Sequence, residues 1–159
     1  MTDVRVSFVD VYPVRQTAGA FELLILRRAA GGRSPGAWEV VHGSVEPGER
    51  PPEAALRELG EETGLVAERF YNLSRVELFY RHRTDEIGLI PVFAAFVRGG
   101  PVRLSAEHDD FAWLPFAEAR PRLAWPRERR ALDDLTILLG TGDAGALEDV
   151  LRIAAPDLR

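Results

Sequence analysis

The first third of the chain alternates apolar and polar residues in a way that is typical of β-strands. The alternation is imperfect, and a turn at residues 17–20 and a glycine-rich loop at residues 30–36 interrupt it. Between these breaks the pattern predicts three strands, Val4–Arg15, Phe21–Leu26 and the short segment Trp38–Val41. The first two of these strands are expected to be joined by the turn at residues 17–20.

The rest of the chain predicts helices and further strands. A helix is expected from Pro51 to Glu62, because paired prolines suit the first turn of a helix and Gly64 suits its left-handed end. Leu89–Arg98 is apolar on both faces, which favours a central strand. The other expected elements are strands at 76–82 and 111–114 and helices at 116–123, 127–139 and 144–154. With no repeat or linker, residues 1–159 are predicted to form one α/β domain with helices packed on a mixed sheet.

Composition excludes several classes of function. The absence of cysteine rules out disulfides, thiolate nucleophiles and cysteine-based zinc sites, and it favours a reducing compartment. All 20 basic residues are arginine, so neither a Schiff-base lysine nor a P-loop lysine is available. The net charge of −5 argues against binding a nucleic acid polymer. Because no targeting signal and no apolar run of about 18 residues is evident, we expect a soluble, cytoplasmic protein with no membrane partner.

Three glutamates gather on one face of the predicted helix. At about 100° per residue, Glu58, Glu61 and Glu62 share a sector, while Ala55, Leu56 and Leu59 share the packing sector. Such an acidic face is either solvated or neutralised by a cation held between the carboxylates. Mg²⁺, with Mn²⁺ as the alternative, prefers oxygen ligands, and a pair of such ions can grip a diphosphate and activate a water.

The spacing around these glutamates decides between the two interpretations. The segment resembles the Nudix box, and its fixed positions are occupied by Gly43, Glu49, Arg57, Glu58, Leu59, Glu61, Glu62, Gly64 and Leu65. A chance match in a chain of this composition is on the order of one in a million. The resemblance implies the Nudix α/β/α sandwich, with a mixed sheet and a loop–helix–loop catalytic motif.

The resemblance also implies roles for individual residues. Glu58, Glu61 and Glu62 match the family's metal ligands, joined by a backbone carbonyl near Gly43, such as that of His42. Arg57 and Glu49 match the pair that orients the catalytic glutamates, a task that suits the planar guanidinium fork.

Weaker similarity extends beyond the box to the bacterial Nudix branch that includes dihydroneopterin triphosphate and dATP pyrophosphohydrolases. This branch places a carboxylate near Glu107, which makes Glu107 a candidate base or additional metal ligand. In the pterin enzymes the basic cluster continues into a Tyr-any-Pro-Gly element, whereas here Arg83 is followed by Thr84-Asp85-Glu86. We therefore place nucleotide substrates ahead of the pterin.

Arginines and tryptophans are the candidate substrate-binding residues. Arg81 and Arg83 are two residues apart on an expected strand, so they either clamp a triphosphate together or are solvated surface charges. Of Arg27 and its neighbour Arg28, we expect one, Arg28, to face the cleft. Trp38 is a candidate stacking platform, with Trp125 as the alternative, and either would bind any base with modest selectivity.

These observations predict a Mg²⁺-dependent pyrophosphohydrolase. Its expected substrate is a small nucleoside or dihydroneopterin triphosphate, cleaved to monophosphate and pyrophosphate, with Glu58 or Glu107 as the general base. The alternatives are a pyrophosphatase acting on dinucleotides or ADP-ribose, and a non-catalytic Nudix-fold module that binds nucleotides. The sequence leaves the oligomeric state open, including a homodimer.

Overall fold

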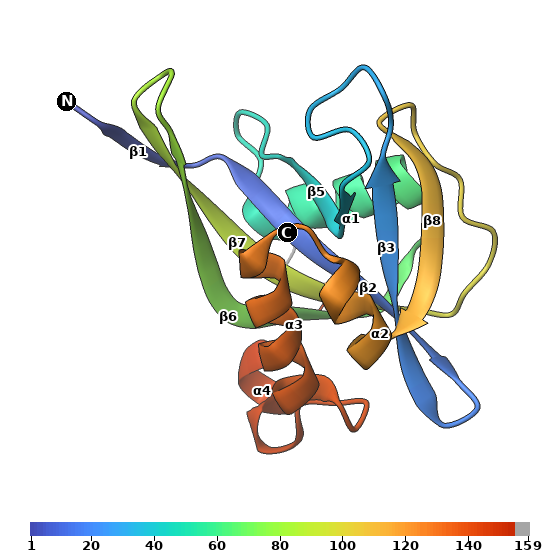
Figure 1. Cartoon of the computed structure of the whole chain (residues 1–159). Helices are drawn as coiled ribbons and strands as arrows, with labels where there is room; N and C mark the ends of the chain where they lie inside the picture. The colour runs from blue at the N-terminus through green and yellow to red at the C-terminus, as the bar shows by residue number, and fades with distance from the viewer. Residues whose placement is uncertain (155–159) are drawn as a thin grey trace.

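The fold is a mixed eight-stranded sheet with helices on both faces, as predicted (Figure 1). The computed structural model describes residues 1–154, so residues 155–159 of the predicted domain lie outside the description. The strands are β1 (Asp3–Val6), β2 (Phe8–Thr17), β3 (Ala20–Arg28), β4 (Trp38–Glu39), β5 (Val41–Ser44), β6 (Ala67–Arg81), β7 (Glu86–Val97) and β8 (His108–Pro115). The helices are α1 (Pro51–Thr63), α2 (Phe116–Arg122), α3 (Pro126–Leu139), the 3₁₀ helix η1 (Gly145–Leu147) and α4 (Glu148–Leu151).

Strand β7 is central, which confirms the expectation drawn from its two apolar faces. It pairs in parallel with β1 and β2 and antiparallel with β6. Strand β2 also pairs with β3 and β5, and β3 pairs with β4 and β8. The sheet is therefore mixed around β7, and the short β5 places the start of the box beside β2.

The sheet separates two hydrophobic cores. On one face, α1 buries Ala54, Ala55 and Leu59 against β2 and β7. On the other face, α3 buries Leu132 and Leu135 together with residues from α2 and α4. Because residues alternate between the faces along each strand, every sheet position has an α1 side and an α3 side. The glutamates of α1 therefore lie on one face of the sheet, and α3 covers the other.

Helix α1 begins and ends at the residues that the sequence indicated. Pro51 and Pro52 occupy its first turn, and the Glu53 carboxylate accepts a hydrogen bond from the backbone N–H of Arg50 at 2.9 Å. At the other end, Gly64 has φ +72° and donates its backbone N–H to the carbonyl of Gly60 at 2.8 Å. These local signals fix the register of the three glutamates on the helix.

Several predicted elements differ from the observed ones. The predicted strand Trp38–Val41 is two strands, β4, which pairs with β3, and β5, which continues to Ser44 and pairs with β2. The predicted N-terminal strand is divided at Ser7, because β1 pairs with residues 86–89 of β7 whereas β2 pairs with residues 92–96. Strand β6 begins nine residues earlier than expected, at residue 67, and its register with β7 shifts between Asn72 and Val76. The last helix ends at Leu151, since the backbone N–H of Ile153 instead bonds to β6 at Phe70.

Among the helices of residues 1–154, none combines the length and apolar character needed to cross a membrane.

Two glycines of α1 provide a matched stability test. Gly64→Ala should lower the free energy of unfolding by about 1–2 kcal/mol, because an L-residue is strained at positive φ. Gly60→Ala should raise it by about 0.5–1 kcal/mol, since Gly60 lies within the helix and an added Cβ there meets nothing within 4 Å. Urea denaturation of both variants measures the difference, and equal effects would contradict the assigned end of α1.

Candidate active site

Two adjoining cavities contain six of the twelve predicted site residues. The carboxylate cavity, about 310 Å³, is lined by Phe8, Arg28, Arg33, His42, Gly43, Ser44, Glu58 and Glu107. The aromatic cavity, about 240 Å³, is lined by Phe8, Arg33, His42, Phe79, Arg81, Ile90, Trp125 and Arg127. Because Phe8, Arg33 and His42 line both, the two cavities adjoin, and together they are called the cleft.

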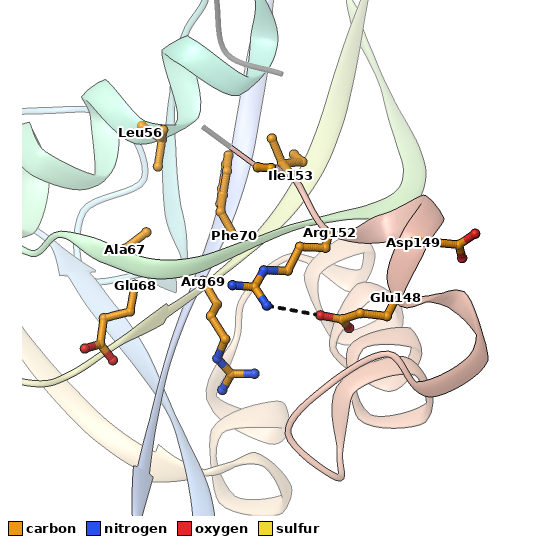
Figure 2. Close-up of a pocket in the computed structure, with 10 residues that line it drawn as sticks. Leu56, Ala67, Glu68, Arg69, Phe70, Glu148, Asp149, Arg152 and Ile153 are labelled. Atoms are coloured by element: carbon orange, nitrogen blue, oxygen red, sulfur yellow. Dashed lines mark hydrogen bonds and ion pairs between the residues drawn. The ribbon is translucent and has the colours of Figure 1, made fainter. Parts of the chain in front are cut away.

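A larger hollow of about 650 Å³ contains none of these residues. Figure 2 shows that it lies between Leu56 of α1, Phe70 of β6 and Ile153, which follows α4, beside an ion pair of Glu148 with Arg152 at 3.3 Å. No glutamate from the predicted metal face lines it. The volume of a cavity therefore does not identify the site. Gly43 and Glu58 of the box line the smaller carboxylate cavity, which makes it the candidate active site.

The guanidinium of Arg57 connects the box loop to α1. Its Nε and Nη2 atoms donate to the two carboxylate oxygens of Glu49 at 2.8 and 3.0 Å, and Nη2 also donates to the Ser44 carbonyl at 2.8 Å. Its Nη1 atom donates to Glu58 at 3.0 Å and to Glu61 at 3.2 Å. The hydrogen bonds from Arg57 hold the pKa of Glu49 below its usual range. Arg57 thus contacts Glu49 and two of the helix glutamates, and its orienting role stays a prediction.

Glu58 packs directly on the backbone of Gly43. A Cβ added at Gly43 would lie 2.0 Å from the carboxyl carbon of Glu58, so no other residue fits at position 43 without displacing this carboxylate. Burial raises the pKa of Glu58, and the hydrogen bond from Arg57 offsets part of that effect. The glycine is therefore required for the close approach of β5 to α1.

Glu62 is the least satisfied acidic group of the site. Its side chain is only 2% exposed, and within residues 1–154 neither carboxylate oxygen has a hydrogen-bond partner. Burial, followed by the charges of Glu58 and Glu107, raises the pKa of Glu62 well above its usual value. A buried carboxylate without a donor is costly unless a cation joins it. The all-oxygen donor set around Glu62 fits a hard divalent cation.

The remaining predicted ligands lie at the rim of the same site. Glu61 is exposed and bonded to Arg57, and Glu107 lines the carboxylate cavity, 3.6 Å from Arg28. In residues 1–154 no three acidic or histidine side chains are yet gathered at metal-ligating distance, because Glu58 and Glu61 both turn toward Arg57. A metal ion would therefore have to compete with Arg57 for the carboxylates of Glu58 and Glu61.

Behind the carboxylate cavity lies a buried acid that sequence reasoning missed. Glu39 is 1% exposed and accepts two hydrogen bonds from Arg33, at 3.0 and 3.1 Å, with His108 at 3.2 Å and Arg28 at 3.8 Å. Burial alone would raise the pKa of Glu39, but His108 and Arg33 lower it overall. Glu39 therefore fixes two of the arginines that line the cleft, including the predicted Arg28, which is 6% exposed.

A second buried acid supports the aromatic cavity. Asp10 contacts Nδ1 of His42 at 2.7 Å and accepts hydrogen bonds from Arg127, at 3.0 Å from Nε and 3.4 Å from Nη2. Burial opposes ionisation of Asp10, but His42 and Arg127 lower its pKa overall. The His42 ring also stacks on Phe8, with 5.0 Å between ring centroids. Sequence reasoning found neither Asp10 nor Arg127.

The four predicted substrate-binding residues divide between the cleft and the surface. Arg28 and Arg81 line the two cavities, whereas Arg83 lies in the exposed turn after β6, beyond the last strand residue, Arg81. Trp38 lies outside both cavities, with the guanidinium of Arg122 4.3 Å from its ring. The alternative tryptophan, Trp125, lines the aromatic cavity. Because β6 ends at Arg81, Arg83 does not share a strand face with Arg81, and the expected pair of arginines on one face is not formed.

Known proteins share this sequence and fold. The NUDIX domain model matches residues 4–135. An octanoyltransferase from Myxococcus xanthus is 38% identical over 122 residues, which are 72% of this chain but only 32% of that protein. The nucleoside triphosphatase NudI from Escherichia coli (strain K12) is 35% identical over 112 residues, which are 65% of this chain and 79% of NudI.

The fold has a counterpart among solved structures. A crystal structure of a C. elegans Ap4A hydrolase binary complex superposes with a TM-score of 0.71 at 23% identity, covering 86% of this chain and 98% of that one. At this identity the likeness concerns the fold alone. Together with the domain match and the geometry of the box, it leads to one assignment: the chain belongs to the Nudix family.

Proposed function

We propose that this protein is a Mg²⁺-dependent pyrophosphohydrolase that cleaves a nucleoside triphosphate to the monophosphate and pyrophosphate. The observation that carries the proposal is the pair of buried, unpartnered oxygens of Glu62 beside Glu58 and Glu107. A site for binding neutral ligands would not need such a cluster of acids. The family is typically dependent on divalent metals, and this donor set fits Mg²⁺, or Mn²⁺ in its place.

Glu58, Glu61 and Glu62 would hold the metal, joined by the backbone carbonyl of His42 or Gly43. When bound, the ion polarises a water and neutralises phosphate charge. In the proposed step the water oxygen attacks phosphorus, the bridging P–O bond breaks, and the water proton passes to a carboxylate. Glu58 and Glu107 both line the carboxylate cavity and are the two candidates for that base.

Arginines of the cleft would bind the rest of the polyphosphate. Arg28 borders the carboxylate cavity next to Glu107, and Arg33 lies where the two cavities join. Guanidinium groups held in place by buried acids are suited to phosphate because their orientation is set before the ligand binds. Arg57 would act through Glu49, Glu58 and Glu61 rather than on the substrate.

Several observations favour a nucleoside triphosphate over the alternatives. NudI, of which this chain covers 79%, is named as a nucleoside triphosphatase. The aromatic cavity has room for one ring system, whereas a dinucleotide would need a second site of this kind. Dihydroneopterin triphosphate is the alternative substrate for the same reaction. The Tyr-any-Pro-Gly element of the pterin enzymes is absent after Arg83, which counts against it.

Product analysis tests the proposed bond cleavage. In the presence of Mg²⁺, the protein is incubated with each substrate in turn: nucleoside triphosphates, dihydroneopterin triphosphate, ADP-ribose and Ap4A. The products are separated by ion-exchange chromatography. We expect monophosphate and pyrophosphate in equal amounts from the triphosphates. Orthophosphate as the sole phosphate product, or preference for ADP-ribose over every triphosphate, would overturn the assignment.

The metal role is tested at Glu62. Glu62→Gln should lower kcat at least about a hundredfold and abolish the rise in Tm that Mg²⁺ gives the unaltered protein. Without metal the variant should be no less stable, because burial and neighbouring acids already disfavour the Glu62 charge. Glu118→Gln, on the exposed face of α2, is the matched control. Full turnover in excess chelator would exclude the mechanism.

Arg57 is tested by a substitution that keeps its charge. Arg57→Lys should lower kcat at least about tenfold, because an ammonium cannot donate at once to Glu49, Glu58 and the Ser44 carbonyl. Arg98→Lys, whose arginine is highly exposed and pairs with Glu68, should leave kcat unchanged. Steady-state kinetics report a loss of catalytic orientation, and circular dichroism reports a loss of folding. A normal kcat in the Arg57 variant would show that Arg57 only stabilises the loop.

A further inference from the structure

The polar groups that line the aromatic cavity are almost all hydrogen-bond donors. Its apolar walls come from Phe8, Phe79, Ile90 and the Trp125 ring, and its polar groups are the guanidiniums of three arginines and the imidazole of His42. No carboxylate is among the lining residues, because Asp10 is fully buried behind them. At about 240 Å³ the cavity lies below the range of drug-sized sites, roughly 300–1,000 Å³, and has room for a single flat ring system.

Arg127 is held by Asp10 yet keeps a donor free for a ligand. Its Nε and Nη2 atoms are committed to Asp10, which leaves Nη1 without a hydrogen bond among residues 1–154. The guanidinium carbon also lies 4.9 Å from the centre of the Trp125 ring, and the side chain is only 11% exposed. Asp10 thus holds a guanidinium fork in one orientation at the wall of the cavity.

Arg81 supplies a second set of donors to the same cavity. Its guanidinium carbon lies 4.4 Å from the centre of the Phe8 ring, and its one ion pair among residues 1–154, with Glu86, is long at 3.6 Å. Most of its N–H groups therefore remain available to a ligand. Arg33, in contrast, is engaged with Glu39 through both terminal nitrogens.

A ring that enters this cavity must present acceptors to these donors. Purines with a 6-keto group offer O6 and N7, the pair that arginine most often binds, whereas adenine places an amino donor at the same edge. Uracil and thymine likewise carry a keto oxygen where cytosine carries an amino group. An amino group facing Arg127 and Arg81 would leave the largely buried donor of Arg127 unpaired, which is costly.

We propose that the aromatic cavity selects the keto-bearing base of the substrate, reading the carbonyl through Arg127 and Arg81. This selectivity rests on the proposed nucleoside triphosphate hydrolysis. The carboxylate cavity would bind the polyphosphate while the base lies in the adjoining cavity across the shared residues Phe8 and His42. Stacking on Trp125 alone would accept any base, so the donors add a preference that the aromatic ring does not.

Two pairs of substrates isolate the keto group. At purine position 6, ITP carries a keto group and ATP an amino group. At pyrimidine position 4, UTP carries a keto group and CTP an amino group. We expect kcat/KM to be at least about tenfold higher for the keto member of each pair. Equal values, or preference for the amino member, would overturn the selectivity while leaving the proposed hydrolysis intact.

A binding experiment keeps the two proposals separable. Isothermal titration of the same four nucleotides, with Ca²⁺ in place of Mg²⁺, should give Kd values at least about tenfold lower for ITP and UTP than for ATP and CTP. If none of the four is hydrolysed but this difference in Kd is found, the proposed function fails and the selectivity of the cavity stands. Equal Kd values would overturn the selectivity independently of turnover.

Arginine variants identify the groups that read the carbonyl. Arg127→Lys keeps a cation beside Asp10 but loses the fork, so the ITP-to-ATP ratio of kcat/KM should fall by about tenfold or more. Arg81→Lys, on a more exposed side chain that the fold does not depend on, should also lower this ratio. Arg98→Lys should leave it unchanged. A ratio unaltered in both cavity variants would overturn the assignment of these arginines.

Discussion

The arrangement of the site depends on one guanidinium between carboxylates that would otherwise repel each other. Arg57 donates to Glu49 in the loop, to Glu58 and Glu61 on α1, and to the Ser44 carbonyl at the end of β5. Only a planar group with five N–H donors can join a loop, a helix and a strand in this way. Without it, the close approach of Glu58 to Gly43 would place an unpaired carboxylate against the backbone.

The four most deeply buried acids among residues 1–154 fall into two groups according to their partners. Asp10 and Glu39 are each held by arginine and histidine, and their pKa values are lowered in spite of burial. Glu62 and Glu128 form no ion pair with the described residues, and burial raises the pKa of both well above the usual range. Glu128 still accepts hydrogen bonds from the backbone N–H of Val40, at 3.2 Å, and has the charge of Arg127 nearby. The two carboxylate oxygens of Glu62 have no hydrogen-bond partner within residues 1–154, which is why only Glu62 indicates a cation site.

The sequence predicted the parts of the site that are local in the chain. The box lies on one loop and one helix, so its spacing fixes the relative positions of Arg57, Glu58 and Glu62. Asp10 and Arg127 carry no such signal, because they are brought together with His42 only by strand register and by the packing of α3. The Arg81–Arg83 pair shows the same limit. Strand alternation applies only as far as the strand extends, and β6 ends at Arg81.

The two cavities adjoin because strand β5 is short and presents different residues to its two sides. Its pairing places Gly43 opposite Val9, on the α1 side, and His42 opposite Asp10, on the α3 side. Gly43 therefore meets the metal-ligand helix while His42 meets the aromatic cavity, only one residue apart. Residue alternation along β5 thus places the metal-ligand helix and the aromatic cavity next to neighbouring residues of one strand.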